Sequence, residues 1–195
     1  MKKLVLASNN QGKLNELQAL FSTVNTELIS QVVFKVPDVE EMGTSFIENA
    51  LLKAENVKPY TSLPILADDS GLIVDALQGS PGLFSARYAG PIATDQENIN
   101  KLLSELKGVA EEKRTARYYC ALVLIQYNEK PIFIEETWEG RILTASQGYQ
   151  GFGYDPVFFD PVLNCSAAEL TREVKNSVSH RGKALLQLLQ VLKKG

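Results

Sequence analysis

The chain has few residues of the types that point to common kinds of chemistry. Its 195 residues include one histidine, His180, and two cysteines. A single histidine has no second histidine with which to form a metal-binding pair, so it is poor evidence of a metal centre. Cys120 and Cys165 lack the spacing of a CxxC motif. This pattern favours buried thiols in a reducing compartment, and we expect a cytoplasmic protein.

Long hydrophobic runs and blocks of basic residues are also missing. The longest apolar run, Cys120 to Ile125, is too short to cross a bilayer, and Leu4 to Ala7 is too short for a signal peptide. The chain has 20 Lys and Arg residues against 23 Asp and Glu residues, a net charge of −3. Because no basic block stands out, we expect neither a nucleic-acid nor a membrane partner. A small anionic substrate is compatible with this charge.

A length of 195 residues suits one sizeable domain or two small lobes. Because no linker or repeat divides the chain, we expect a single domain over residues 1–195. Helical and strand patterns alternate early and two long strand patterns follow, which favours an α/β or α+β fold around a mixed sheet. We expect strands at residues 4–7, 28–36, 116–127 and 131–142, and a strand pair within 65–76 around a turn at Asp68 and Asp69. We expect helices after residue 12, at 44–58 with Thr44 as N-cap, at 95–106 behind Thr94, and from about 179.

The most informative segment is Ala67-Asp68-Asp69-Ser70-Gly71-Leu72, in which two carboxylates lie between two apolar runs. Carboxylates at the mouth of a buried strand are costly to desolvate unless they are paired or bind a metal. Mg²⁺ is held mainly by carboxylates, water and substrate phosphates. The alternative is a tight hairpin, since Asp and Gly are common in turns. The flanking runs are more apolar than an exposed hairpin requires.

A second candidate is the polar turn between the first strand and the first helix, which consists of Ser8, Asn9, Asn10, Gln11, Gly12 and Lys13. Backbone N–H groups and the helix dipole favour anions at such a position. The segment is not a Walker A loop, because the required glycine and Ser/Thr positions are absent. It is either a phosphate cradle or an ordinary capped helix start.

Two further candidates lie before and within the helix expected at residues 44–58. Glu40 and Glu41 precede it, where adjacent acids are typical of helix-dipole partners, with metal binding as the alternative. Asn49 and Lys53 share one face of the helix, four residues apart. Lys53 either extends from the edge of the core or points into a cleft.

The remaining candidates come from loops and from the last helix. The glycine-rich loop at residues 79–90 contains Arg87, which suits a phosphate, a carboxylate or a structural ion pair. In the segment Gly151 to Pro156, aromatic rings between glycines either stack on a base or anchor the loop. Lys175 comes shortly before His180 and Arg181, which oppose the dipole at a helix start. Such a local conflict is typical of functional sites.

Taken together, these segments resemble the non-canonical purine nucleoside triphosphate pyrophosphatases, also called inosine triphosphate pyrophosphatases. Five segments carry the resemblance in the order of the family: Ser8 to Lys13 with Glu16, Thr44 to Ala54, Asp68 to Gly90, Phe152 to Phe158, and Glu169 to Ala184. At Ser8-Asn9 many members have Thr-Gly. Because Asn tolerates left-handed backbone, we expect this departure to have a small effect.

The resemblance implies an elongated α/β protein with a long central mixed sheet, and two lobes flanking an active-site cleft in a homodimer. It implies Mg²⁺-dependent hydrolysis of ITP, dITP or XTP to the monophosphate and pyrophosphate, which removes deaminated purines from the nucleotide pool. By position, Asp69 would be the proton acceptor and a metal ligand, with Glu40 or its neighbour Glu41 as the other carboxylate. Lys53 would assist Ser8 to Lys13 in holding the triphosphate. The nucleoside would contact Ser70, Phe152, Gly153, Tyr154, Asp155, Lys175, His180 and Arg181.

Three other functions compete with this one. A pyrophosphatase of similar build would act on modified pyrimidine or methylated nucleotides, and a substrate panel separates the two. A nucleotide-binding regulator without turnover would not need a water-activating carboxylate. A nucleic-acid-binding domain would need a basic surface stripe, which the sequence does not contain.

Overall fold

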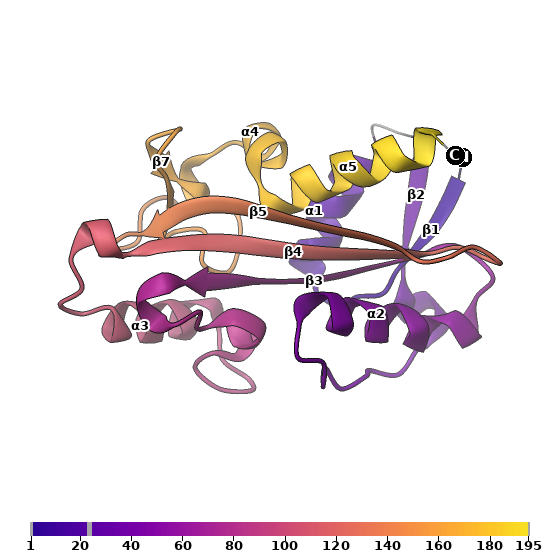
Figure 1. Cartoon of the computed structure of the whole chain (residues 1–195), viewed down its shortest axis with the longest axis horizontal. Helices are drawn as coiled ribbons and strands as arrows, with labels where there is room; N and C mark the ends of the chain where they lie inside the picture. Colours follow the sequence, from indigo (N-terminus) through magenta and orange to yellow (C-terminus); the bar gives the residue numbers. More distant parts are fainter. Residues whose placement is uncertain (1, 23–24, 195) are drawn as a thin grey trace. The chain divides into compact units, whose positions relative to one another are not determined.

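The computed structural model of the chain describes residues 2–22 and 25–194 (Figure 1). Its strands are β1 (Lys2–Leu6), β2 (Thr26–Ser30), β3 (Ile65–Val74), β4 (Thr115–Ile125), β5 (Ile132–Ile142), β6 (Phe158–Asp160) and β7 (Cys165–Ser166). Its α-helices are α1 (Gln11–Ser22), α2 (Phe46–Val57), α3 (Asp95–Glu105), α4 (Arg172–Val178) and α5 (His180–Lys194). None of the helices within these residues is both long and apolar enough to cross a membrane.

The strands form one seven-stranded sheet in the order β2-β1-β3-β4-β5-β6-β7. β1 pairs in parallel with both β2 and β3, whereas β6 pairs antiparallel with both β5 and β7. Parallel and antiparallel pairs in one sheet confirm the expected mixed α/β architecture.

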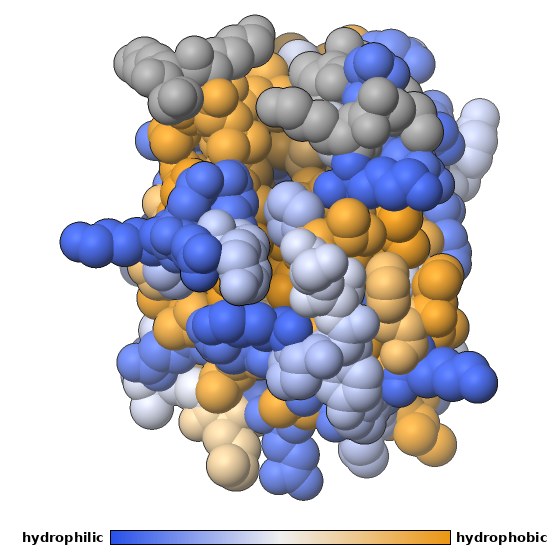
Figure 2. Space-filling model, turned by 90° about the vertical axis from the view of Figure 1, so that its right-hand side faces the viewer, coloured by the Kyte–Doolittle hydropathy of each residue, from blue (hydrophilic) through white to orange (hydrophobic). Residues whose placement is uncertain are grey.

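The chain divides into two compact units, which we describe separately. Unit 1 consists of residues up to 69 with residues 120–136 and 181 onwards, and it contains the sequence-predicted phosphate and acidic segments. Its core packs β1 and β3 against α1 and α5, with Leu6, Leu17, Leu66 and Leu185 fully or almost fully buried. Figure 2 views the side on which β1 and β2 lie in Figure 1, and hydrophobic and hydrophilic side chains alternate over that face.

Unit 2 consists of residues 70–119 and 137–180 and has a core of its own. Leu72, Leu102, Ile142 and Phe158 are fully buried in it, next to Trp138. Helix α3 begins as predicted, because the Thr94 side chain and Glu97 form a capping box at its first turn.

The structure corrects the prediction of a turn at the two aspartates. β3 is a single strand that runs straight through Asp68 and Asp69, so no hairpin interrupts it. All five residues from Ile65 to Asp69 are buried, because β3 lies inside the sheet between β1 and β4. A strand covered on both faces has a continuous apolar run rather than alternating apolar and polar residues. In β3 the two aspartates interrupt this run, but the strand continues past them to Val74.

Two further corrections concern residues 28–45. The strand expected at 28–36 ends at Ser30, whose side chain accepts from the Val32 N–H and caps a short 3₁₀ helix, η1 (Gln31–Phe34). Val32 and Val33 are 62% and 69% exposed, so neither belongs to a buried strand. The N-cap of α2 lies one residue later than predicted, since Ser45 rather than Thr44 caps the helix, which begins at Phe46. The short elements β6, β7 and α4 were not predicted.

Candidate active site

The two aspartates of β3 take part in different networks within unit 1, and both are buried. Successive side chains of a strand point to opposite faces. Asp68 forms ion pairs with Lys13, from the first turn of α1, and with Arg181, from the first turn of α5, whose Nε lies 2.9 Å from Asp68 Oδ2. Arg181 Nη1 also pairs with Glu16 of α1. The structure thus engages Arg181 with two carboxylates of unit 1, whereas the resemblance assigned it to the nucleoside.

The Asp68 carboxylate is held ionised by its cationic partners. Burial opposes its charge, but Arg181 and Lys13 outweigh that effect and set the pKa of Asp68 well below the usual range. The buried Cys120 thiol lies 3.5 Å from Asp68 Oδ2. Burial and the Asp68 charge raise the pKa of Cys120 well above its usual value, so this thiol is a protonated part of the core.

Asp69 is joined to the acidic segment before α2 by one lysine. Lys53 Nζ lies 2.6 Å from Asp69 Oδ1 and 2.7 Å from Glu41 Oε1, and it links the two carboxylates. Lys53 also approaches the Asp68 carbonyl oxygen at 3.5 Å, and Lys13 approaches the same oxygen at 3.3 Å. Ammonium groups from α1 and α2 therefore converge on one point of β3.

The net pKa shift of Asp69 is opposite to that of Asp68, because at Asp69 burial outweighs the cations. Desolvation raises the pKa of Asp69 above its usual value, although Lys53 and Lys13 favour the ionised form. Desolvation disfavours the charge of Lys53, but Asp69 and Glu41 outweigh it and raise the Lys53 pKa. The site therefore keeps Lys53 charged and makes Asp69 a stronger base than an ordinary aspartate.

The sequence left Glu40 and Glu41 undistinguished, and the structure separates them. Glu40 is exposed, whereas Glu41 is half-buried and contacts Lys53. Within residues 2–22 and 25–194 no group of three or more His, Cys, Asp or Glu side chains is arranged to hold a metal ion. Glu41 and Asp69 still fit Mg²⁺, which often binds one or two carboxylates and takes its other ligands from water and phosphates.

The segment from Ser8 to Lys13 forms a capped helix start in unit 1. The Ser8 hydroxyl accepts from the Asn10 N–H at 3.1 Å, and Asn10 Oδ1 accepts from the Lys13 N–H at 3.0 Å. Asn9 does not adopt the left-handed backbone that asparagine tolerates. Its side-chain amide instead donates to Asp38 and accepts from Gln31. Gln11 and Gly12 begin α1, with Gln11 exposed and donating to Asn15.

The sequence-predicted residues of unit 2 gather around one buried carboxylate. Asp155 Oδ2 accepts from Lys175 Nζ at 2.6 Å and from the Phe152 N–H at 2.9 Å. The Lys175 ammonium lies 5.2 Å from the centre of the Phe152 ring. A Cβ on Gly151, which has φ of +79°, would lie 2.0 Å from Asp155 Oδ2, so only glycine fits this turn.

Neighbouring residues complete this part of unit 2. The Gly153 N–H donates to Asp95, and the Tyr154 hydroxyl donates to the Ser85 carbonyl at 2.8 Å. Ser70 lies in β3, half-buried, directly after Asp69. His180 is buried and stacks on Tyr118 with ring centres 4.8 Å apart. Sequence reasoning missed Tyr118, whose hydroxyl donates to Asp155, because a tyrosine within a predicted strand is typical of ordinary core packing.

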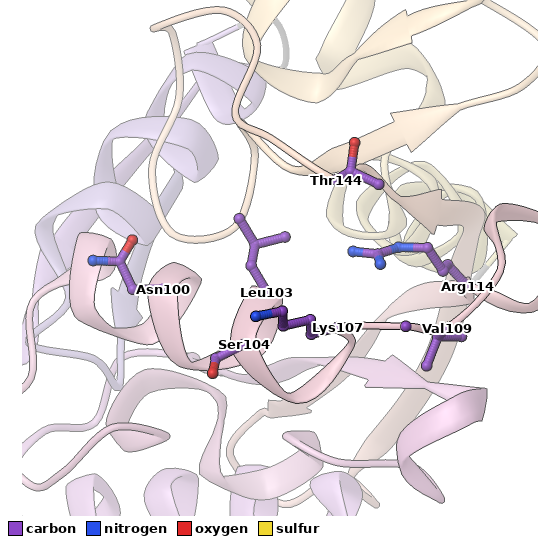
Figure 3. Close-up of a pocket in the computed structure, with 8 residues that line it drawn as sticks. Asn100, Leu103, Ser104, Lys107, Val109, Arg114 and Thr144 are labelled. Carbon is purple, nitrogen blue, oxygen red and sulfur yellow. The ribbon is translucent and has the colours of Figure 1, made fainter.

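An open pocket of about 450 Å³ in unit 2 contains none of the predicted site residues (Figure 3). Arg114 lines it and is buried, but its three nitrogens donate to the carbonyls of Ile142, Leu106 and Leu143. The polar ends of Asn100, Ser104 and Thr144 point away from the Arg114 guanidinium. Because its polar groups do not converge, we assign this pocket no ligand.

Asp68→Asn is expected to destabilise the protein most at neutral pH, because it removes the buried counter-charge of Lys13 and leaves the buried Arg181 with Glu16 alone. Removing one partner of a buried ion pair typically costs about 3–5 kcal/mol in the free energy of unfolding. Folding lowers the pKa of Asp68. Its ionised form therefore contributes fully above about pH 4, the range of an unfolded aspartate, and the contribution is lost as the pH falls towards the folded pKa.

Urea unfolding of both proteins from pH 7 to pH 3 measures this difference. Asp75→Asn is the matched control, because Asp75 pairs with Arg117 at the exposed surface and its removal should cost less than about 1 kcal/mol. Equal unfolding free energies for Asp68→Asn and the wild type at pH 7 would contradict the stabilising role of the network.

Comparison with known sequences gives full-length matches. A sequence model of the Ham1 family matches residues 4–191. A dITP/XTP pyrophosphatase from Vibrio parahaemolyticus is 53% identical over 194 residues, which cover 98% of this chain and 97% of the relative. A dITP/XTP pyrophosphatase from Salmonella typhi is 49% identical over 197 residues and covers both chains in full.

Solved structures match as fully. A HAM1 protein from Coxiella burnetii superposes with a TM-score of 0.89 at 45% identity, with 100% of both chains covered. The Ham1 protein of Staphylococcus aureus superposes with a TM-score of 0.87 at 39% identity, with 99% of both chains covered. Sequence and fold agree over essentially the whole length, and the chain belongs to the Ham1 family.

Proposed function

We propose that this protein hydrolyses non-canonical purine nucleoside triphosphates, namely dITP, XTP and ITP, to the monophosphate and pyrophosphate in the presence of Mg²⁺. The observation that carries the proposal is the ion-paired chain of Glu41, Lys53 and Asp69, beside a second lysine at β3. Relatives named dITP/XTP pyrophosphatase support the choice of substrate. Removing such nucleotides would cleanse the nucleotide pool.

In the proposed reaction a water oxygen attacks the α-phosphorus, and the bond from this phosphorus to the oxygen bridging the α- and β-phosphates breaks. Asp69 accepts the proton of the water, and pyrophosphate leaves with the bridging oxygen. The raised pKa of Asp69 supports this role, because a stronger base gains more by accepting a proton. Lys53, at 2.6 Å, holds the Asp69 carboxylate in place.

The charge of the cluster supports a need for a metal ion. Three cations, Lys13, Lys53 and Arg181, are interleaved with four carboxylates, those of Glu16, Glu41, Asp68 and Asp69. The excess of one negative charge repels a triphosphate unless further positive charge enters the site. Mg²⁺, bound to Asp69 and to Glu41 or the neighbouring Glu40, would neutralise phosphate charge and polarise the scissile bond.

For the phosphates themselves we propose the segment from Ser8 to Lys13, at the N-terminus of α1. The helix dipole favours anions there, and Lys13 adds a point charge beside β3. Two backbone N–H groups of the segment already donate to side chains, one to the Ser8 hydroxyl and one to the Asn10 amide oxygen, so they do not face a phosphate. The remaining attraction comes from Lys13, Lys53 and the helix terminus.

For the nucleoside we propose the residues of unit 2, which include Ser70. The family resemblance adds Arg181. Phe152, flanked by glycines and half-buried, is suited to stacking on a base, and Lys175 and Asp155 fix its loop. Hypoxanthine and xanthine present a keto oxygen at C6, which accepts a hydrogen bond, whereas adenine presents an amino group. A buried donor left unpaired by adenine costs roughly 1–3 kcal/mol, or about ten- to a hundredfold in selectivity.

We further propose that the protein works in the cytoplasm, and that it forms a homodimer, as the family resemblance implies. The two cysteines are free thiols, which suits a reducing compartment. Analytical ultracentrifugation measures the oligomeric state, and a sedimentation mass of one chain at micromolar concentration would contradict the dimer.

A substrate panel tests the function as a whole. With Mg²⁺ present, the wild-type protein should release pyrophosphate, and not orthophosphate, from ITP, dITP and XTP, and should act far more slowly on ATP and dTTP. Removing Mg²⁺ with a chelator should abolish the release. A preference for dUTP or for a methylated nucleotide would instead favour the related pyrophosphatases of other specificity.

Asp69→Asn should lower kcat by roughly 10²- to 10⁴-fold, the usual contribution of a general base. The KM for dITP should change much less, since the amide keeps the size of the side chain. Glu55→Gln on the exposed face of α2 removes the same charge from unit 1 and should leave kcat unchanged. Pyrophosphate release at the wild-type rate by Asp69→Asn would remove Asp69 from the chemical step.

Phe152→Ala should raise the KM for dITP by about 5- to 150-fold, because stacking one base on an aromatic ring contributes roughly 1–3 kcal/mol. Inhibition by inorganic triphosphate, which has no base, should keep the same inhibition constant. The control is Tyr149→Ala, which removes a 95% exposed ring from the same loop region. Equal KM values for dITP in Phe152→Ala and the wild type would exclude Phe152 from base binding.

A further inference from the structure

The carboxylate of Glu41 lies on a stretch of chain that has no regular structure of its own. Residues 36–44, here called the acid loop, lie between η1 and α2 and form neither helix nor strand. Asp69, by contrast, is fixed by the hydrogen-bonded ladder of β3. A loop places a side chain precisely only if other groups hold the loop. The contacts of the acid loop therefore decide where Glu41 lies.

Four polar side chains of α2 contact the acid loop. Glu48 accepts from the N–H and the hydroxyl of Thr44, where the loop meets the helix, and the other three contact the loop in succession. Asn49, Lys53 and Asn56 are spaced by four and three residues, which puts them on one face of the helix. Each contacts a different point of the loop: Asn49 binds Gly43, Lys53 binds Glu41, and Asn56 binds Pro37. The loop therefore runs along this face in the direction opposite to the helix.

The contact at Asn49 is the more buried of the two asparagine contacts. Asn49 is 1% exposed, and its Oδ1 accepts from the Gly43 N–H at 2.8 Å. A Cβ on Gly43 would lie 2.6 Å from this oxygen, so the glycine permits the close approach. No partner within the described residues accepts from Asn49 Nδ2. Leaving a buried donor unpaired costs free energy, so the bond that the Asn49 oxygen makes to the acid loop is kept despite that cost.

The contact at Asn56 fixes the other end of the acid loop. Asn56 Nδ2 donates to the Pro37 carbonyl at 2.8 Å. The next residue, Asp38, accepts from Asn9 in the segment before α1. Glu41 thus lies between two points at which the main chain is bound to α2, and its carboxylate meets Lys53 between the two asparagines.

We propose that Asn49 and Asn56 are positioning residues, which bind the acid loop to α2 and thereby hold the Glu41 carboxylate beside Lys53 and Asp69. Only the predicted effect on kcat rests on the function proposed above. The binding of the loop itself is a property of unit 1 and is measured without substrate.

The test compares Asn49→Ala, Asn56→Ala and Gly43→Ala with the wild type. Asn49→Ala removes the acceptor from the helix, whereas Gly43→Ala disturbs the same contact from the loop. Asn56→Gln keeps a donor for the Pro37 carbonyl and should recover part of the loss. Asn100→Ala is the matched control, because Asn100 is an exposed asparagine of α3 whose Oδ1 accepts from Gln96.

Three measurements separate positioning from general damage to the fold. Hydrogen exchange at the Gly43 amide should be at least tenfold faster in Asn49→Ala. Calorimetric titration with Mn²⁺ alone, without nucleotide, should show weaker binding in the three alanine variants. With dITP, kcat should fall by about 10- to 100-fold, the usual loss from misplacing a catalytic group by about 1 Å, and KM should change less than threefold.

Each result has a definite consequence. Unchanged exchange at Gly43 in Asn49→Ala would overturn the loop contact itself. Faster exchange, with Mn²⁺ binding and kcat equal to those of Asn100→Ala, would overturn the positioning role. If urea unfolding shows that Asn49→Ala does not fold, Mn²⁺ binding and kcat of Gly43→Ala and Asn56→Ala test the positioning role instead. A wild-type protein that releases no pyrophosphate contradicts the proposed function, while the exchange and Mn²⁺ data still test the loop.

Discussion

The buried charge of Asp68 is the constraint on which the rest of unit 1 depends. A carboxylate inside a strand covered on both faces is tolerated only with cations in contact, and Lys13 and Arg181 supply them. Both cations lie in the first turns of their helices, where the helix dipole disfavours positive charge. Asp68 offsets that cost and fixes the starts of α1 and α5 against β3. The next residue of the same strand, Asp69, points to the opposite face and contacts Lys53 of α2.

Much of this arrangement could be predicted from the sequence, and the errors have physical causes. The aspartates were recognised as paired or metal-bound because apolar runs flank them. The predicted turn at Asp68 and Asp69 was wrong because Asp and Gly are also turn residues, and local pattern does not reveal a strand covered on both faces. Thr94 was predicted correctly as a helix cap, since the capping box is a local interaction. β6 and β7 have three and two residues, too few for any periodicity.

The sequence indicated which residues belong to the candidate site more fully than it indicated which of them contact one another. Glu40 and Glu41 are adjacent and chemically alike, so only the path of the acid loop distinguishes them. The resemblance implies Arg181 at the nucleoside, and the structure adds its contacts to Asp68 and Glu16, each more than a hundred residues away in the sequence. Tyr118, which stacks on His180, carries no signal that differs from core packing. Contacts between side chains that lie far apart in the sequence are set by the tertiary structure.

Asp69 and Glu41, the two carboxylates proposed to act in catalysis, are positioned in two different ways. A strand position is fixed by the backbone ladder, so Asp69 needs little besides Lys53 to orient it. A loop position has no ladder, and ordering each of its residues costs roughly 1–2 kcal/mol of conformational entropy. Side-chain amides of α2 offset part of that cost where they bind the main chain at Pro37 and Gly43. The same bonds flank Glu41 on both sides, so its carboxylate meets Lys53 from a stretch of main chain that is held at both ends.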